Sequence, residues 1–295
     1  MSLFKQQLHD YQCLINDFLE RCFPESDEVL EQSMRYSIMA GGKRIRPVLS
    51  VSVCEMLGSD PKKALGLAGA LEMIHTYSLI YDDLPCMDND TLRRGKPTNH
   101  VVFGEDIALM AGMGLYARAF ETVSDTQQEF GLTDRQVLDG IKVLASASGT
   151  NGIVSGQVLD IGNVADNPKV DLDYLMRIHR LKTSAMLEAA VELGAIAANA
   201  TVQQSESLCQ YAKAIGLAFQ IRDDILDVIG DQQHMGKSVG KDKLAKKITF
   251  VDLLGIERAQ NEVERLTKEA KESLSVFANR EFLSTFADVL CGRMY

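Results

Sequence analysis

The stretch SLIYDDLPCMDND at residues 78–90 places several carboxylates inside an otherwise apolar run. The stretch LAFQIRDDILD at residues 217–227 does the same about 140 residues later. Adjacent carboxylates repel one another, and burying them without a partner is costly in free energy. A chain that does this twice is expected to hold a cation, and magnesium takes oxygen ligands that it commonly shares with phosphates. The two stretches therefore predict a magnesium-bridged diphosphate held between two helices.

The size and composition of the chain limit the classes of protein it can be. Its 295 residues are 46% hydrophobic and 24% charged, enough for one large globular domain or two ordinary ones. The net charge of −10 argues against nucleic-acid binding, which calls for a basic face. The six cysteines show no zinc or redox spacing. We therefore expect a cytoplasmic protein with reduced thiols, no leader segment and no membrane segment.

Helical signals run along the chain. Apolar residues recur at helical spacing from Ala64 to Ile74, after a cap and first-turn proline at Ser59-Asp60-Pro61. We find no alternating strand pattern with hairpin signals, and candidate loops lie at residues 89–99, 162–171 and 230–247. These signals predict an all-α fold, with one domain over residues 1–295 in which antiparallel helices surround a deep central cavity.

The second acidic stretch is predicted to lie on one helix. Asp223 and Asp227 are four residues apart and therefore share a helix face. Asp224 points roughly 100° away from them, within reach of a neighbouring ion or a basic partner. Solvated surface carboxylates are the plain alternative, but the apolar residues around them and the other acidic stretch favour a metal site.

The first acidic stretch has two more residues between its carboxylates, which are Asp82, Asp83 and Asp88. Pro85 removes a helical hydrogen bond, and we expect the distorted turn to swing Asp88 back alongside Asp82. A calcium loop is excluded because its alternating acidic positions, central Gly and closing Glu are absent.

Basic residues accompany both acidic stretches. Lys43 and Arg46 in GGKRIRP share a face if that segment is helical, Arg93-Arg94 follows the first stretch, and Lys237 to Lys247 follow the second. Arg suits bidentate phosphate contacts and Lys suits point-charge contacts. Each patch alone is most simply a solvated surface, but together they predict phosphate binding. His75, seven residues before Asp82, is either a structural histidine or a hydrogen-bond donor to a second phosphate group.

Five segments resemble those of the trans-isoprenyl diphosphate synthases, above all the bacterial farnesyl diphosphate synthases: GGKRIRP (41–47), LEMIHTYSLIYDDLPCMDNDTLRRGKPTNH (71–100), SGQVLDI (155–161), HRLKTSAML (179–187) and GLAFQIRDDILDVIGD (216–231). The resemblance covers nearly the whole chain in the same order. It implies an isoprenoid synthase fold, usually a homodimer. The implied reaction ionises an allylic diphosphate, joins the cation to isopentenyl diphosphate and then loses a proton.

The resemblance also implies roles for individual residues. Magnesium, as three ions when diphosphate is bound, would be held by Asp82, Asp83, Asp88, Asp223, Asp224 and Asp227. The allylic diphosphate would be contacted directly by Arg93, Lys182 and Lys237, and the isopentenyl diphosphate by Lys43, Arg46, His75 and Arg94. Thr183 and Gln220 would direct oxygen dipoles at the carbocation, and Arg293 would close over the site. The catalytic residues would be Lys182, Thr183, Gln220, Asp82 and Asp223.

Product length depends in this family on an aromatic residue near the first acidic stretch. Tyr77 lies five residues before Asp82, about 7.5 Å down a helix. With its neighbour Ser78, it implies that the cavity ends at fifteen carbons. The product would then be farnesyl diphosphate, made by condensing isopentenyl diphosphate with dimethylallyl and then geranyl diphosphate. A core tyrosine is the plain alternative, and geranyl or geranylgeranyl diphosphate are alternative products.

Other classes fit less well. A terpene cyclase does not need the second diphosphate site, and a non-catalytic subunit of a heteromeric prenyl synthase is expected to lose an aspartate motif. A helical-repeat scaffold predicts a regular period that we do not find. Two positions depart from the family pattern: Met113 stands where an acidic residue is usual, and Lys246 where Gly is usual. We expect activity to survive both.

Overall fold

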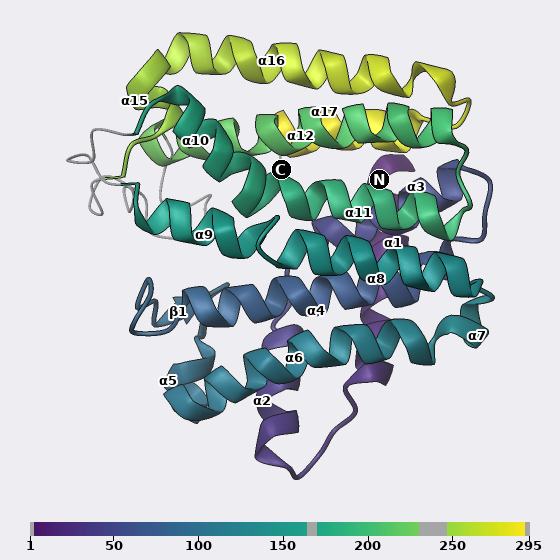
Figure 1. Cartoon of the computed structure of the whole chain (residues 1–295), viewed down its shortest axis with the longest axis vertical. Coiled ribbons are helices and arrows are strands. Elements are labelled where there is room, and N and C mark those ends of the chain that lie inside the picture. Colours follow the sequence, from purple (N-terminus) through teal and green to yellow (C-terminus); the bar gives the residue numbers. More distant parts are fainter. Residues whose placement is uncertain (1–2, 164–169, 230–246, 293–295) are drawn as a thin grey trace. The chain divides into compact units, whose positions relative to one another are not determined.

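The computed structural model describes residues 3–163, 170–229 and 247–292 (Figure 1). This part of the chain is helical apart from one two-stranded hairpin, which confirms the predicted all-α class. None of its helices is both long and apolar enough to cross a membrane. The chain divides into two compact units, unit 1 with residues 1–142 and 196–199 and unit 2 with residues 143–195 and 200–295. The single domain and the deep central cavity stay predictions.

Unit 1 holds the N-terminal elements. They are α1 (Leu3–Cys22), α2 (Val29–Ile38), α3 (Ile45–Met56), the 3-10 turn η1 (Pro61–Ala64), α4 (Leu65–Asp82), β1 (Leu92–Arg93), β2 (Lys96–Pro97), α5 (Asn99–Phe103), α6 (Glu105–Asp125), α7 (Gln127–Phe130) and the larger part of α8 (Asp134–Ser148). The centre of this unit is α4, whose residues 65–74 are all buried. The predicted cap is confirmed, since the Asp60 carboxylate accepts a 2.9 Å hydrogen bond from the Lys62 amide just before α4.

The hairpin corrects the prediction that residues 89–99 form a loop. In the turn between β1 and β2, Arg94 (φ 53°) and Gly95 (φ 76°) both have positive φ, as a two-residue type I′ turn requires. Only the second residue is a glycine. Asn-Gly and Asp-Gly are the usual sequence signals of this turn, and Arg-Gly is not one of them. The sequence therefore did not predict the hairpin.

Unit 2 holds the C-terminal elements. They are α9 (Ile153–Ile161), α10 (Leu172–His179), the π-helical turn η2 (Arg180–Ser184), the larger part of α11 (Ala185–Ala197), α12 (Val202–Ile229), α15 (Phe250–Leu254), α16 (Ile256–Ser273), the 3-10 turn η3 (Leu274–Val276) and α17 (Glu281–Gly292). Figure 1 shows that α16 runs beside α12. The buried face of α16 is an apolar stripe made of Ala259, Val263, Leu266 and Ala270. The long helix α12 thus forms the core of the unit and carries the second acidic stretch.

Candidate active site

In unit 1, Asp82 is the last residue of α4, and the chain that follows folds back onto it. The Asp88 amide donates to the Asp82 carbonyl at 2.9 Å, and the amides of Met87 and Asn89 both donate to the Leu84 carbonyl. Pro85, which has no N–H, lies within this turn. The backbone contact confirms the prediction that Asp88 returns to Asp82.

Asp83 faces a different partner. Its buried carboxylate accepts from Arg93 in a bidentate pair, with Nε to Oδ2 at 2.7 Å and Nη2 to Oδ1 at 2.5 Å. Burial lowers the pKa of the Arg93 guanidinium, but the bonds to Asp83 outweigh burial and the pKa is raised. The pair fixes the direction of Arg93, so in this structure Asp83 positions a cation.

A second set of cations gathers around the loop before α3. Arg94 donates from Nη1 to the Gly41 carbonyl. A Cβ on Gly42 would lie 2.5 Å from Arg94 Cζ, so this approach requires a glycine there. Arg46 Nη1 lies 3.1 Å from His75 Nε2. The structure therefore joins Arg46 to His75 and Arg94 to the glycine loop that leads into Lys43.

Lys43 and Arg46 were expected to share a helix face only if their segment is helical, and the structure does not meet that condition at Lys43. The helix α3 starts at Ile45, and its cap residue Arg44 has a left-handed backbone (φ 51°), so Lys43 precedes the helix. The Arg44 side chain, which the sequence did not single out, is buried against Glu72, with Nη1 to Oε1 at 2.7 Å. It also donates to Asn16 and to the Ile38 carbonyl. Arg44 thus anchors the loop that carries Lys43.

In unit 2, two lysines converge on one carboxylate. Lys182 on η2 and Lys247 before α15 each place Nζ 2.6 Å from Oδ2 of Asp160 on α9. Burial raises the pKa of Asp160, but the two ammonium groups overcome burial and lower it. Two positive charges against one negative charge leave a net cationic centre suited to an anion. Lys247 belongs to the basic patch that was predicted to bind phosphate, whereas Asp160 was not among the predicted site residues.

The neighbouring residue Thr183 contacts the second acidic helix. Its hydroxyl donates to Gln220 Oε1 at 2.7 Å. Thr183 and Lys182 both lie on the π-helical turn η2, an irregularity that often occurs at functional sites. The structure therefore brings together the two residues that were predicted to direct oxygens at the carbocation.

Along α12, Asp223 and Asp227 are half-buried and Asp224 is buried. One Asp224 oxygen accepts the Phe250 amide at 2.8 Å and lies 3.4 Å from His179 Nε2, and the other lies 3.5 Å from Gln220 Nε2. The sequence predicted either an ion or a basic partner beside Asp224, and the structure contains a basic partner, His179. Asp224 thereby links α10, α12 and α15.

The donor set suits magnesium, since each acidic stretch offers carboxylate oxygens from residues that are not fully buried. Residues 3–163, 170–229 and 247–292 contain no cluster of three or more candidate metal-ligating side chains. A magnesium ion typically takes one or two carboxylates, with waters and phosphates completing its shell. Asp82 with Asp88, and Asp223 with Asp227, fit such a partial set. Lys237, Lys246 and Arg293 lie outside the described residues.

The two predicted chain-length residues lie side by side on α4. The Tyr77 ring contacts the Tyr81 and Tyr116 rings, with centroids 5.0 and 5.2 Å apart. Ser78 is buried and its hydroxyl donates to the His75 carbonyl.

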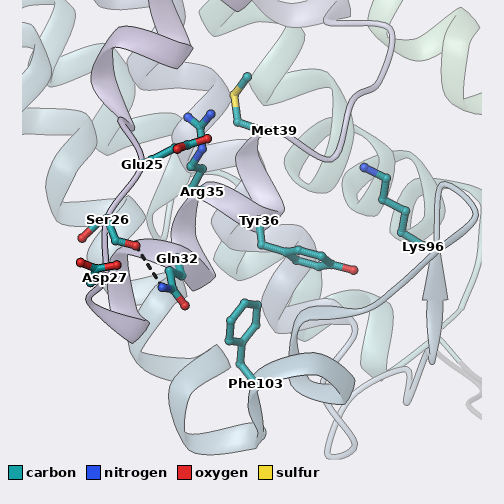
Figure 2. Close-up of a pocket in the computed structure, with 9 residues that line it drawn as sticks. All are labelled: Glu25, Ser26, Asp27, Gln32, Arg35, Tyr36, Met39, Lys96 and Phe103. Atoms are coloured by element: carbon teal, nitrogen blue, oxygen red, sulfur yellow. Dashed lines mark hydrogen bonds between the residues drawn. The ribbon is translucent and has the colours of Figure 1, made fainter.

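A surface hollow of about 570 Å³ lies elsewhere in unit 1 (Figure 2). Figure 2 shows Tyr36 and Phe103 edge to face on one side, with Glu25 and Arg35 on another. None of the predicted site residues lines this hollow, so it has no part in the candidate site.

Comparison with known proteins gives a consistent family. The sequence pattern of the polyprenyl synthetase family matches residues 27–279. A chloroplastic geranylgeranyl pyrophosphate synthase from Capsicum annuum is 46% identical over 93% of this chain and 74% of its own length. The large subunit 1 of a chloroplastic heterodimeric geranylgeranyl pyrophosphate synthase from Arabidopsis thaliana is 45% identical over 90% of this chain and 72% of its length. An FPP/GFPP synthase from Zymomonas mobilis has a TM-score of 0.86 and 36% identity, with 96% of this chain and 97% of that chain covered.

These relatives correct one prediction and weaken another. The expected cytoplasmic location is contradicted, because relatives that match most of the chain are named chloroplastic. Net charge and cysteine spacing do not distinguish an enzyme of the cytoplasm from an enzyme of the chloroplast. The farnesyl product is not confirmed, and the names favour the geranylgeranyl alternative. The chain belongs to the polyprenyl synthetase family and is a prenyltransferase with the isoprenoid synthase fold, as the resemblance to trans-isoprenyl diphosphate synthases implied.

Proposed function

We propose that this chain condenses isopentenyl diphosphate with allylic diphosphates in two steps or more. The observation that supports this most is that each unit has its own cationic group. Unit 1 pairs Arg46 with His75, and unit 2 joins Lys182 and Lys247 through Asp160. Two diphosphate substrates need two such groups, whereas a terpene cyclase needs one.

In this proposal the allylic diphosphate is held by the residues that flank the acidic stretches. Asp82, Asp88, Asp223 and Asp227 hold magnesium, which when bound neutralises the diphosphate oxygens and stabilises the leaving group. Arg93, fixed by Asp83, and Lys182 bind the same diphosphate. Lys247 joins them because its ammonium shares Asp160 with Lys182. Lys237 is also predicted to bind the allylic diphosphate.

The reaction breaks the allylic carbon–oxygen bond, and the electron pair leaves with the diphosphate. The double bond of isopentenyl diphosphate then attacks the allylic carbocation, and the product cation loses a proton. Thr183 and Gln220 present oxygens to the positive charge. We assign the proton to the released pyrophosphate. Lys43, Arg46, His75 and Arg94 orient the isopentenyl diphosphate.

For the product, we propose geranylgeranyl diphosphate, which the names of the curated relatives support. Farnesyl diphosphate is a second candidate, because Tyr77 places an aromatic ring on α4 one to two turns from Asp82 and the Zymomonas neighbour is named an FPP/GFPP synthase.

The test is product analysis. Purified protein is incubated with radiolabelled isopentenyl diphosphate, magnesium and dimethylallyl, geranyl or farnesyl diphosphate in turn, and the products are sized by chromatography. A twenty-carbon product from all three supports geranylgeranyl diphosphate, and arrest at fifteen carbons selects farnesyl diphosphate. A terpene hydrocarbon released from geranyl or farnesyl diphosphate without isopentenyl diphosphate would overturn the proposal.

We also propose that the active form is a homodimer, as the resemblance implies. The Arabidopsis relative named as a heterodimer subunit makes a heteromer the alternative. Light scattering on the purified protein, with activity measured in the same fractions, decides between them. An active monomer would contradict both.

A further inference from the structure

Asn163 connects the end of α9 to the segment before α15 through its side-chain amide. Its Nδ2 donates to the Ile248 carbonyl at 3.0 Å, and the Ile248 N–H donates to its Oδ1 at 3.3 Å. Both bonds therefore join Asn163 to a single backbone residue, 85 residues further along the chain. Asn163 is only 3% exposed, so loss of its side chain would leave buried backbone groups without partners.

The pairing explains why this position holds an asparagine. A backbone residue offers one N–H and one C=O, and a primary amide can accept from the first and donate to the second at the same time. An ionised aspartate of the same shape is only an acceptor. The amide of Asn163 thus fixes both the position and the orientation of Ile248.

The end of α9 is itself held in place. The Asn163 N–H donates to the Asp160 carbonyl at 3.1 Å, so the two residues belong to one turn of backbone. The Tyr174 hydroxyl of α10 donates to the Leu159 carbonyl at 3.0 Å, beside Asp160. From this turn, Asp160 contacts the Lys247 side chain and Asn163 contacts the next residue of the backbone.

Lys247 is the residue whose place depends on these contacts. Its ammonium and that of Lys182 each lie 2.6 Å from the same oxygen of Asp160, although like charges repel one another. A lysine side chain is also flexible, so one shared carboxylate restrains it only in part. The backbone after Lys247 is held by two buried side chains, Asn163 at Ile248 and Asp224 at Phe250. A fixed backbone limits where the Lys247 ammonium can lie.

We propose that Asn163 is a positioning residue, which acts through Lys247 in the binding of the allylic diphosphate. The inference rests on the proposed function, in which Lys182 and Lys247 bind that diphosphate. Without the Asn163 amide, Lys247 keeps its charge and its partner Asp160 but loses the fixed backbone. The diphosphate then has to order the lysine when it binds, which weakens its binding. Isopentenyl diphosphate is assigned to residues of unit 1 and is not affected.

The experiment is a double-mutant cycle of the wild type, Asn163→Ala, Lys247→Met and the Asn163→Ala/Lys247→Met double variant. The KM is measured for dimethylallyl diphosphate and for isopentenyl diphosphate, each with the other substrate saturating. We expect Asn163→Ala to raise the KM for dimethylallyl diphosphate about tenfold when Lys247 is present, and less than about twofold in the Lys247→Met protein. The KM for isopentenyl diphosphate should stay within about twofold of the wild type in all four proteins.

A binding measurement gives the same cycle without turnover. Each protein is titrated calorimetrically with pyrophosphate in the presence of magnesium. The Kd should rise about tenfold in Asn163→Ala and should change less than about twofold when Asn163→Ala is added to Lys247→Met.

A control variant separates positioning from a general loss of stability. Tyr211→Phe removes another buried bond of unit 2, in which the Tyr211 hydroxyl donates to the Leu283 carbonyl at 2.9 Å. It should lower the melting temperature without changing either KM. Melting temperatures also verify that each protein is folded. Asn163→Ser, whose single hydroxyl cannot reproduce both bonds, replaces Asn163→Ala if the latter is not folded, and the same KM should rise.

The inference is overturned if the folded Asn163 variant binds dimethylallyl diphosphate and pyrophosphate as tightly as the wild type, or if it raises the two KM values equally. It is also overturned if the variant weakens binding by the same factor with and without Lys247, because Asn163 would then not act through that lysine. A wild type that joins isopentenyl diphosphate to no allylic diphosphate would instead overturn the proposed function. The pyrophosphate titration would still test the role of Asn163, so the two failures are distinguishable.

Discussion

Asp160 is the carboxylate that Lys182 and Lys247 share in unit 2. Its folded-state pKa is lowered, because Lys182 and Lys247 outweigh the effect of burial. A carboxylate whose pKa falls on folding stabilises the protein above its unfolded pKa of about 3.9 and loses this contribution as pH drops through the lower folded value. We predict that Asp160→Asn lowers the free energy of unfolding at pH 7 by about 1–3 kcal/mol, discounted for the partly exposed lysines. Urea unfolding should show that the difference in the free energy of unfolding between the variant and the wild type becomes smaller below about pH 4. A gap that stays constant from pH 7 to pH 3 would contradict this assignment.

Asp223 and Asp224 are neighbours with different surroundings, and we predict different consequences of changing them. Asp224→Ala leaves the buried Phe250 amide without its acceptor, which should cost about 1–3 kcal/mol of stability. Asp223→Asn should cost little stability but raise the magnesium concentration needed for half-maximal activity by at least about tenfold. Urea unfolding and a magnesium titration separate the two effects. A fully stable Asp224→Ala with a changed magnesium requirement would instead make Asp224 a metal ligand.

At the residue scale, the sequence was sufficient for residues whose role follows from their spacing along the chain. The Asp82–Asp88 turn is of this kind, since Pro85 stands between the two residues. Arg44 and Asp160 were missed because their partners are distant. Glu72 is 28 residues from Arg44, and Lys247 is 87 residues from Asp160. No short-range pattern distinguishes such buried charges from the exposed ones beside them.

At the element scale, α9 determines where the π-helical turn η2 lies. A Cβ on Gly156 would lie 2.3 Å from the Lys182 amide nitrogen and 2.6 Å from its Cα, both backbone atoms. We therefore predict that Gly156→Ala displaces η2, lowers stability by about 1–3 kcal/mol and reduces kcat at least tenfold. Gly292→Ala is the control, because among the described residues no atom outside its chain neighbours and its own helix backbone lies within 4 Å of a Cβ there. Equal activity of the two variants would show that η2 tolerates the shift.

Most helices were predictable because periodicity and caps are local, as at the start of α4. Two backbone positions could not be predicted from the sequence, for the same reason. Arg44 and Arg94 both have positive φ without being glycine, and tertiary contacts hold them there. For Arg44 these contacts include the Glu72 ion pair, and for Arg94 the bond to the Gly41 carbonyl. The sequence left open whether the segment with Arg44 is helical, and it placed Arg94 in a loop.

At the scale of the whole molecule, composition and periodicity were sufficient for the fold class, and the resemblance of five segments to a known family was sufficient for the family. Product length was not predictable, because the motifs that define the family do not specify it, and the names of the relatives favour a longer product than the one predicted. Tyr77 was recognisable from its distance to Asp82, whereas its contact with the Tyr116 ring on α6 is known only from the structure. Location within the cell was not predictable from composition either.

The proposed function requires carboxylates of both units, and ligand-induced stability tests this requirement without turnover. A ligand that binds only the folded protein stabilises it by about 2.7 kcal/mol at one hundred times its Kd. We predict that magnesium with pyrophosphate raises the melting temperature, and that chelation of magnesium reverses the rise. Asp82→Asn in unit 1 and Asp223→Asn in unit 2 should each remove most of it. Asp139→Asn, which changes an exposed pair with Arg135, should retain it. Full stabilisation of either Asp82→Asn or Asp223→Asn would mean that the corresponding acidic stretch does not hold the metal-bound diphosphate.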